Sequence, residues 1–144
     1  MILPDDYIRQ ASEAVHAVGG MFVLDCIASG TIWVDMKAIG VDVLISAPQK
    51  GWSGSPCCAL VMLSEVAREH VLMTSSSSFS CDLRKWLDIM ETYEKGGHAY
   101  HSTMPTDSIP RRSNSSRISK KFAAAESSNS LSSQAVPWST PVSK

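Results

Sequence analysis

An acid and an amine each follow an apolar run in the first half of the chain. Phe22 to Asp25 ends in a carboxylate, and the run from Val41 to Ser46 is soon followed by Lys50. Most lysines in folded proteins are exposed to solvent, so an exposed loop lysine is the more common expectation for Lys50. The alternative is an enclosed amine that attacks a carbonyl and forms a covalent C=N link. The surroundings of Lys50 therefore decide between a loop lysine and a catalytic one.

Both runs are predicted to be β-strands that end close to these side chains. Residues 41–46 alternate and are rich in β-branched side chains, and Pro48 ends the pairing because it lacks an N–H donor. Asp25 and Lys50 are 25 residues apart, which suits one strand-crossover-strand unit. Ligands of open α/β sheets bind outside the carboxyl ends of the strands, so we expect both side chains at one such edge.

The other elements place these strands in an α/β fold. Apolar spacing of three and four predicts a helix that Asp5 or Asp6 caps and that Gly19-Gly20 ends, with His16 as a structural histidine. A third strand is predicted over residues 57–63, a helix capped by Ser64 over 65–70, and a helix over 82–95. We expect a mostly parallel sheet with flanking helices.

Three motifs in order resemble one enzyme family. They are Phe22 to Ser29 (F-V-L-D-C-I-A-S), Ser46 to Lys50 (S-A-P-Q-K) and Tyr100 to Asp107 (Y-H-S-T-M-P-T-D). Together they look like the class V aminotransferases, which are fold-type I pyridoxal phosphate enzymes, and most like the alanine–glyoxylate/serine–pyruvate branch. The resemblance runs from about Met1 to Asp107. It implies that residues 1–107 are the central part of a pyridoxal phosphate-binding large domain.

The resemblance also assigns roles to five residues. It implies that Lys50 is the catalytic lysine, which carries the cofactor and later moves a proton, and that Asp25 pairs with the pyridine nitrogen. Gln49 matches a position near the phosphate or the ring substituents. Tyr100 and Thr103 match positions that reach the cofactor phosphate of the neighbouring subunit in a homodimer.

The implied reaction is transfer of an amino group from alanine or serine to a 2-oxo acid such as glyoxylate or pyruvate. Two departures reduce the expected activity: Pro48 stands where many relatives have serine, and the family's phosphate loop and substrate-clamping arginine lie outside the resemblance. We expect a truncated chain with weak or no transaminase activity of its own. The alternatives are a class V desulfurase or lyase fragment, and a non-catalytic α/β remnant that only associates with another chain.

Residues 108–144 differ in composition from the rest of the chain. They hold 12 serines and a net charge of +5, against −6 for residues 1–107. Such a segment buries too little apolar area to order itself, so we expect a disordered tail, consistent with a shifted reading frame. A nucleic-acid-binding tail is the less favoured reading, because only Phe122 and Trp138 could stack on bases.

The cysteines and the overall composition favour a cytoplasmic protein without a metal site. Cys26, Cys57, Cys58 and Cys81 form no C-x-x-C pair, and the adjacent Cys57 and Cys58 are expected to be buried as small residues. There is no signal-peptide pattern, and no apolar run reaches about 18 residues, so no membrane span is expected.

Overall fold

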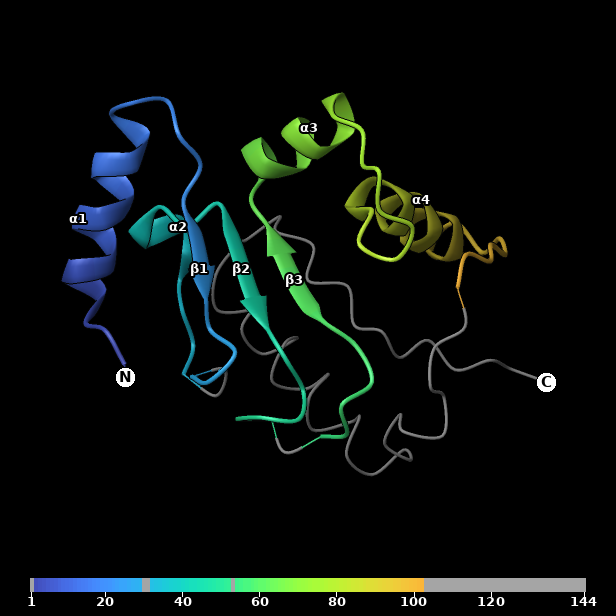
Figure 1. Cartoon of the computed structure of the whole chain (residues 1–144), viewed down its shortest axis with the longest axis horizontal. Helices are drawn as coiled ribbons and strands as arrows, with labels where there is room; N and C mark the ends of the chain where they lie inside the picture. Colours follow the sequence, from blue (N-terminus) through green and yellow to red (C-terminus); the bar gives the residue numbers. More distant parts are fainter. Residues whose placement is uncertain (1, 30–31, 53, 103–144) are drawn as a thin grey trace.

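A computed structural model describes residues 2–29, 32–52 and 54–102. In chain order the elements are α1 (Asp5–His16), β1 (Val23–Asp25), α2 (Met36–Ile39), β2 (Val43–Ser46), β3 (Leu60–Leu63), α3 (Glu65–Met73) and α4 (Leu83–Glu94). Figure 1 shows the strands at the centre, with α1 beside β1 and with α3 and α4 beyond β3. The predictions for Thr103 and for residues 108–144 lie outside the described residues.

The three strands form a mixed sheet in the order β1-β2-β3. β1 and β2 are parallel, as expected, whereas β2 and β3 are antiparallel, so the prediction of a mostly parallel sheet is wrong for this part of the chain. A parallel return needs a crossover, usually a helix, on one face of the sheet. Here the hydrogen bond from Gly54 N to Pro48 O (2.7 Å) closes a turn soon after β2, and the chain reverses before β3.

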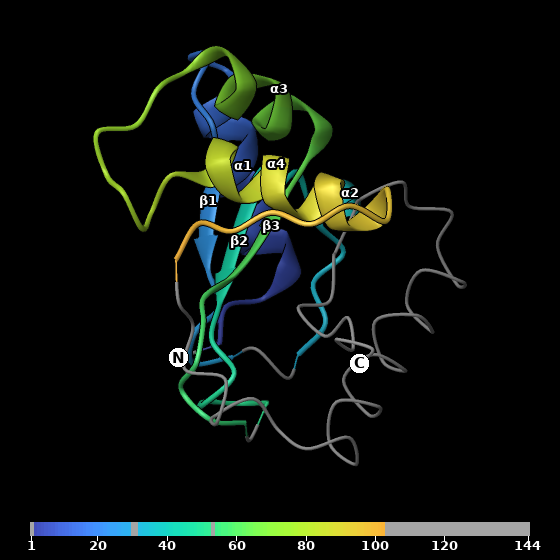
Figure 2. The same ribbon diagram turned by 90° about the vertical axis from the view of Figure 1, so that its right-hand side faces the viewer.

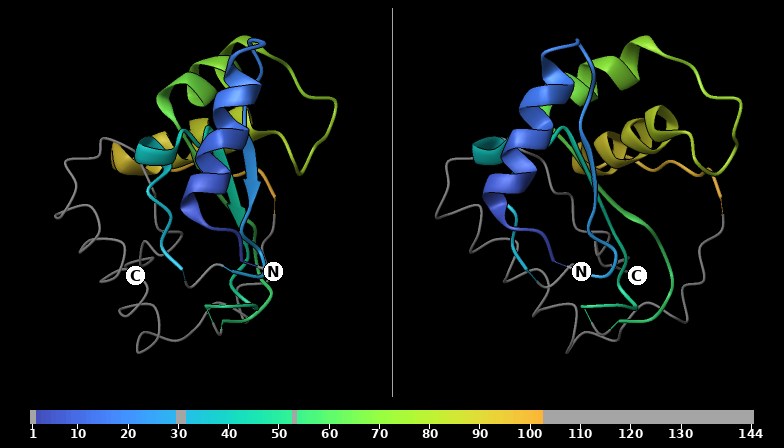
Figure 3. Two further views of the ribbon diagram at one scale, coloured as in Figure 1. Left: turned by 90° about the vertical axis from the view of Figure 1, so that its left-hand side faces the viewer. Right: turned by 60° about the vertical axis from the view of Figure 1, so that its left-hand side comes forward.

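One face of the sheet carries the core. Leu24, Leu44 and Met62 are neighbours in register and point to the same face. There Leu44 packs with Ile8 of α1 and Ile39 of α2, and Figure 3 shows α1 in front of the strands. Side chains alternate along a strand, so the opposite face carries the next residues of each strand. On that face Val23 is 52% exposed, which shows that no described element covers it there.

Local capping explains where most helices begin. Ser64 and Asp82 accept hydrogen bonds from the backbone N–H three residues on, at the starts of α3 and α4. The Ser64 cap was predicted, and the Asp82 cap was not. The prediction that Asp5 or Asp6 caps α1 is wrong. Pro4 occupies the cap position, and both acids lie in the first turn, where the helix dipole favours negative charge.

The buried carboxylate of Asp42 joins several elements at the other end of the sheet. One of its oxygens lies 2.7 Å from His16 Nε2 and accepts from Phe22 N at 2.7 Å, and the other accepts from Ser64 Oγ at 3.4 Å. These contacts connect the end of α1, the segment before β1 and the start of α3. The prediction of a structural role for His16 is confirmed by this contact.

We expect Asp42→Ala to lower the free energy of unfolding by about 2–3 kcal/mol, because it removes hydrogen bonds to a charged group and orphans a backbone donor. Urea denaturation followed by circular dichroism measures the change. The matched control is Asp6→Ala, since Asp6 is exposed and pairs only with Arg9 three residues away. That control should shift stability by less than about 0.5 kcal/mol. Equal effects of the two substitutions would contradict the role of Asp42.

An ion pair joins α3 to α4. Arg68 of α3 pairs with Glu91 of α4, and Lys95 approaches the same carboxylate at 3.6 Å. The hydrogen bond from Arg68 lowers the pKa of Glu91 below its usual value of 4.5. A lowered carboxylate pKa adds stability above the unfolded-state pKa, and this stability is lost as the pH falls through the folded-state value.

We therefore expect the stability difference between the wild-type chain and Glu91→Gln to be largest at neutral pH. The difference should stay within about 1 kcal/mol, because the pair is partly exposed and screened. It should shrink as the pH falls below the usual pKa of glutamate, since the wild-type carboxylate then becomes neutral. Urea midpoints measured from pH 7 downward give the profile, and a difference that does not depend on pH would disprove it.

Candidate functional site

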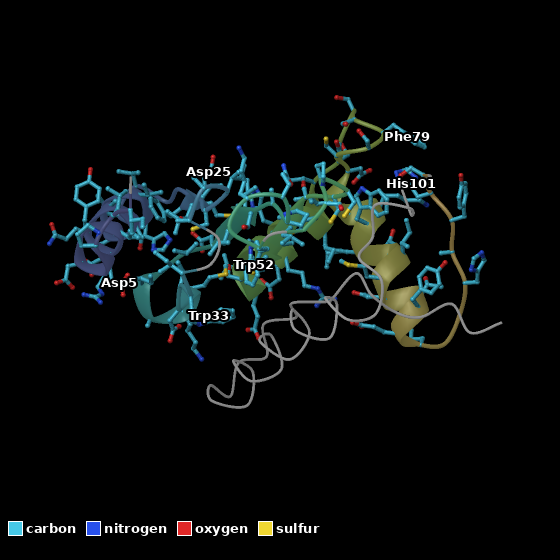
Figure 4. The ribbon with its side chains drawn as sticks, turned by 90° about the horizontal axis from the view of Figure 1, so that it is seen from below. Asp5, Asp25, Trp33, Trp52, Phe79 and His101 are labelled. Carbon is cyan, nitrogen blue, oxygen red and sulfur yellow. The ribbon has the colours of Figure 1, made fainter. Side chains whose placement is uncertain are left out.

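Asp25 is the last residue of β1 and lies on the open face of the sheet. Its register partner is Ile45 of β2, and Figure 4 shows it on the side of the strands away from α2. The carboxylate is held locally, since Oδ1 accepts from Ile27 N at 2.9 Å. A carboxylate has further acceptor capacity at its second oxygen, so Asp25 can receive another donor.

Lys50 lies in the turn that follows β2. The turn begins at the buried Pro48, whose carbonyl accepts from Gly54 N. A Cβ at Gly54 would lie 3.2 Å from Pro48 Cβ, so a larger residue there would force the turn open. Gln49 and Lys50 are both exposed. Within the described residues the turn therefore presents the amine to solvent and does not enclose it.

Ser46 and Trp52 connect this turn to the sheet. Ser46 is the last residue of β2 and is 1% exposed. Its Oγ accepts from Trp52 Nε1 at 3.1 Å and donates to Cys26 O at 3.4 Å, just beyond the end of β1. The backbone pairing also continues there, with Cys26 N donating to Ile45 O at 2.7 Å. These bonds keep the ends of β1 and β2 together and hold the base of the Lys50 turn against them.

The fold thus brings Asp25, Gln49 and Lys50 to one edge of the sheet, because their strands are adjacent and parallel. Ser46 and Trp52 were not predicted to support this edge. The two residues are six apart, which is not a recognised motif. Their hydrogen bond depends on how the turn folds back to bring the Trp52 indole to Ser46. Asp42 was also missed as a structural centre, since its partners are 20 to 26 residues away in sequence.

Tyr100 lies elsewhere, on a segment that runs back beside α4, as Figure 2 shows. His101 Nε2 lies 2.7 Å from Phe79 O, and the centroids of the two rings lie 4.3 Å apart with the ring planes tilted by 41°. Tyr93 OH donates to Ala99 O at 3.0 Å. Figure 4 accordingly places His101 and Phe79 together, apart from Asp25. The Tyr100 side chain is 73% exposed.

The cysteines differ from the expectation in part. Cys26 is buried in the core, and this burial raises the pKa of its thiol. Cys57 and Cys58 are only partly buried, so the expectation that both are buried is wrong. In the described ranges no group of three or more His, Cys, Asp or Glu side chains could hold a metal ion. None of the helices built from those ranges is both long and apolar enough to cross a membrane.

Comparison with known proteins supports the fold alone. The chain is similar in structure to an alanine–glyoxylate aminotransferase from Nostoc sp., with a TM-score of 0.58 and 24% sequence identity. The match covers 81% of this chain and 29% of that chain. The chain therefore spans less than a third of the length of that enzyme. No protein-family profile and no curated protein matches this sequence.

The donor set at the sheet edge suits pyridoxal phosphate in its chemistry. A carboxylate with an available acceptor oxygen fits the protonated ring nitrogen, and a primary amine fits the aldehyde. Asp25 supplies the carboxylate from the end of β1, and Lys50 supplies the amine from the turn that follows β2. Gln49 adds an amide beside Lys50. The residue types present thus match the groups that the ring nitrogen and the aldehyde require.

We expect Ser46→Ala to lower the free energy of unfolding by about 1–3 kcal/mol, because the Trp52 N–H loses its acceptor in a partly buried place. Near-ultraviolet circular dichroism should also change, since the indole is no longer held against β2. The control is Ser76→Ala, which removes an exposed hydroxyl that accepts only from Ser78 N. If both variants behave alike, the Ser46 contact does not support the edge.

Proposed function

We propose that this chain is part of the large domain of a pyridoxal phosphate-dependent aminotransferase and that its sheet edge binds the cofactor. The observation that carries the proposal is the parallel pairing of β1 and β2, with Asp25 opposite Ile45, which puts the acid and the lysine turn at one edge. The structural likeness to an aminotransferase supports the proposal at the level of the fold. The amino donor is alanine or serine and the acceptor is a 2-oxo acid.

Each residue of the edge has a defined task in this proposal. Pyridoxal phosphate supplies, when bound, an aldehyde carbon and a ring that accepts electrons. Asp25 orients the ring by accepting from its N–H, and the bond from Ile27 N keeps the carboxylate in place. Lys50 would hold the cofactor through its Nζ amine and would move the proton at the substrate Cα.

The remaining parts of the site come from outside this edge. Tyr100 follows Ala99, whose carbonyl accepts a hydrogen bond from Tyr93 of α4, and its side chain is exposed, which suits a contact with a second subunit. We propose that Tyr100 and Thr103 serve the phosphate of the partner subunit in a homodimer. In this proposal the second subunit also covers the exposed edge and excludes water from it. The lower dielectric would strengthen the contacts of Asp25 and Lys50 with the cofactor.

A second candidate function is a non-catalytic α/β remnant that associates with another chain. The exposure of Lys50, together with the half-exposed Val23 on the open sheet face, favours this reading. Under it, Lys50 is an ordinary surface lysine and the open face is only a contact surface. The two candidates differ in whether Lys50 reacts selectively with the cofactor.

We expect pyridoxal phosphate to label Lys50 in preference to the other exposed lysines. The full chain is incubated with the cofactor and reduced with borohydride, and peptide mass spectrometry then locates the label. Lys50→Ala should lose the dominant label, whereas Lys37→Ala, which changes an exposed lysine of α2, should keep it. Asp25→Asn should weaken binding by about 10-fold to 100-fold, the worth of a charged hydrogen bond.

Even labelling of all exposed lysines would reject the cofactor site and favour the remnant. An unchanged affinity of Asp25→Asn for the cofactor would contradict the proposed contact between Asp25 and the ring nitrogen. Circular dichroism of each variant checks that the comparison is made between folded chains.

A further inference from the structure

Two adjacent thiols stand in the loop between the Lys50 turn and β3. Cys57 and Cys58 are both free and partly exposed. Their sulfur atoms lie 3.8 Å apart, with Cys57 Sγ donating to Cys58 Sγ. Because Leu60 pairs with Ser46, the two thiols precede β3 at the same edge of the sheet as Lys50. No task in the proposed function uses them, so their chemistry is a separate question.

The backbone geometry disfavours a direct disulfide between Cys57 and Cys58. Residues linked by a trans peptide have Cα atoms about 3.8 Å apart, whereas disulfides usually join Cα atoms about 4.4–6.8 Å apart. A bond between the sulfurs would therefore require the backbone of the loop to move. The thiols already face each other, however, at a separation that one inserted atom can span.

The separation suits two bonds from the sulfurs to a single thiophilic atom. Zinc makes bonds of about 2.3 Å to thiolates, and other thiophilic atoms make bonds of similar length. At the angle of about 95–100° of a pyramidal trivalent atom, two such bonds place the sulfurs about 3.4–3.5 Å apart, so sulfurs that lie 3.8 Å apart need to approach by only a few tenths of an ångström. Zinc itself takes four ligands in structural sites. Among the described residues no third His, Cys, Asp or Glu completes such a group. The atom that fits best is one that needs only two sulfurs from the protein.

We propose that Cys57 and Cys58 form a two-thiol binding site for monosubstituted trivalent arsenicals. Such a compound, R–As(OH)2, carries its third bond to carbon, so two thiols complete its coordination. Two As–O bonds and two S–H bonds break, two As–S bonds form, and both thiol protons leave with hydroxide as two molecules of water. Arsenic remains in the +3 state, so the step needs no oxidant or reductant.

The raised pKa of Cys58 agrees with a reaction in which the neutral thiols condense with the arsenical. Burial, with the neighbouring Cys57, raises the pKa of Cys58 to about 12. A thiol that keeps its proton is a poor nucleophile toward peroxides and disulfides, which react with the thiolate. Condensation with an arsenic hydroxide releases that proton as water.

The test uses the full reduced chain and phenylarsine oxide. We expect one equivalent to bind and to remain during a challenge with excess glutathione, a monothiol, and to leave on addition of a dithiol. Alkylation of the unprotected thiols in denaturant and peptide mapping should leave only Cys57 and Cys58 unalkylated. Retention through two bonds should exceed that through one by about 100-fold or more, as for linked binding groups in general.

Cys57→Ser and Cys58→Ser should each lose the glutathione-resistant adduct, whereas Cys81→Ser, which changes an exposed thiol, should retain it. Loss of the adduct to glutathione in the wild-type chain, or its survival in either single variant, would overturn the site. The mapping of protected thiols needs no variant, so misfolding of a substituted chain does not block the test. Phenylarsine oxide does not engage Lys50, so this result is independent of cofactor labelling.

Discussion

The parallel pairing of β1 with β2 is the contact on which the candidate site depends. The register that sets Asp25 opposite Ile45 continues through Cys26 N to Ile45 O, so the two strands end together. Strands of three and four residues are weak by themselves, and the packing of α1 and α2 on one face holds them in place. A slip of one residue would turn Asp25 to the core face and remove the acid from the open side.

The two ends of the sheet use their polar side chains differently. At the end where β2 begins, Asp42 is buried and its oxygens serve His16, Phe22 and Ser64, so that end is structural. At the end where β2 finishes, the charged side chains of Asp25 and Lys50 are exposed and the Ser46 hydroxyl is buried. An exposed acid and amine contribute little to stability, so this end of the sheet does not depend on them for folding. Under the proposed function, the parts of the enzyme beyond this chain cover the open face.

Local rules accounted for much of the fold. The helices after Ser64 and Asp82 each begin at a side chain that caps the first turn, and the Ser64 cap forms as predicted. The first two strands follow from β-branched runs and are adjacent and parallel as expected. The direction of β3 and the partial exposure of Cys57 and Cys58 were not predictable, because both depend on how residues 47–59 turn. The anchoring of His101 by Phe79 also joins residues 22 apart, beyond the reach of any periodicity.

By itself, the sequence determined the type of each main element and the residue types at the strand ends, because capping, branching and periodicity act over a few residues. Tertiary structure decided which elements meet. It made β3 antiparallel to β2 and buried Asp42, whose carboxylate contacts His16, Phe22 and Ser64. It also brought the Trp52 indole N–H to the Ser46 hydroxyl and left Lys50 exposed to solvent. The physical reason is that burial and long-range hydrogen bonding are properties of neighbours in space, and a linear pattern does not specify those neighbours.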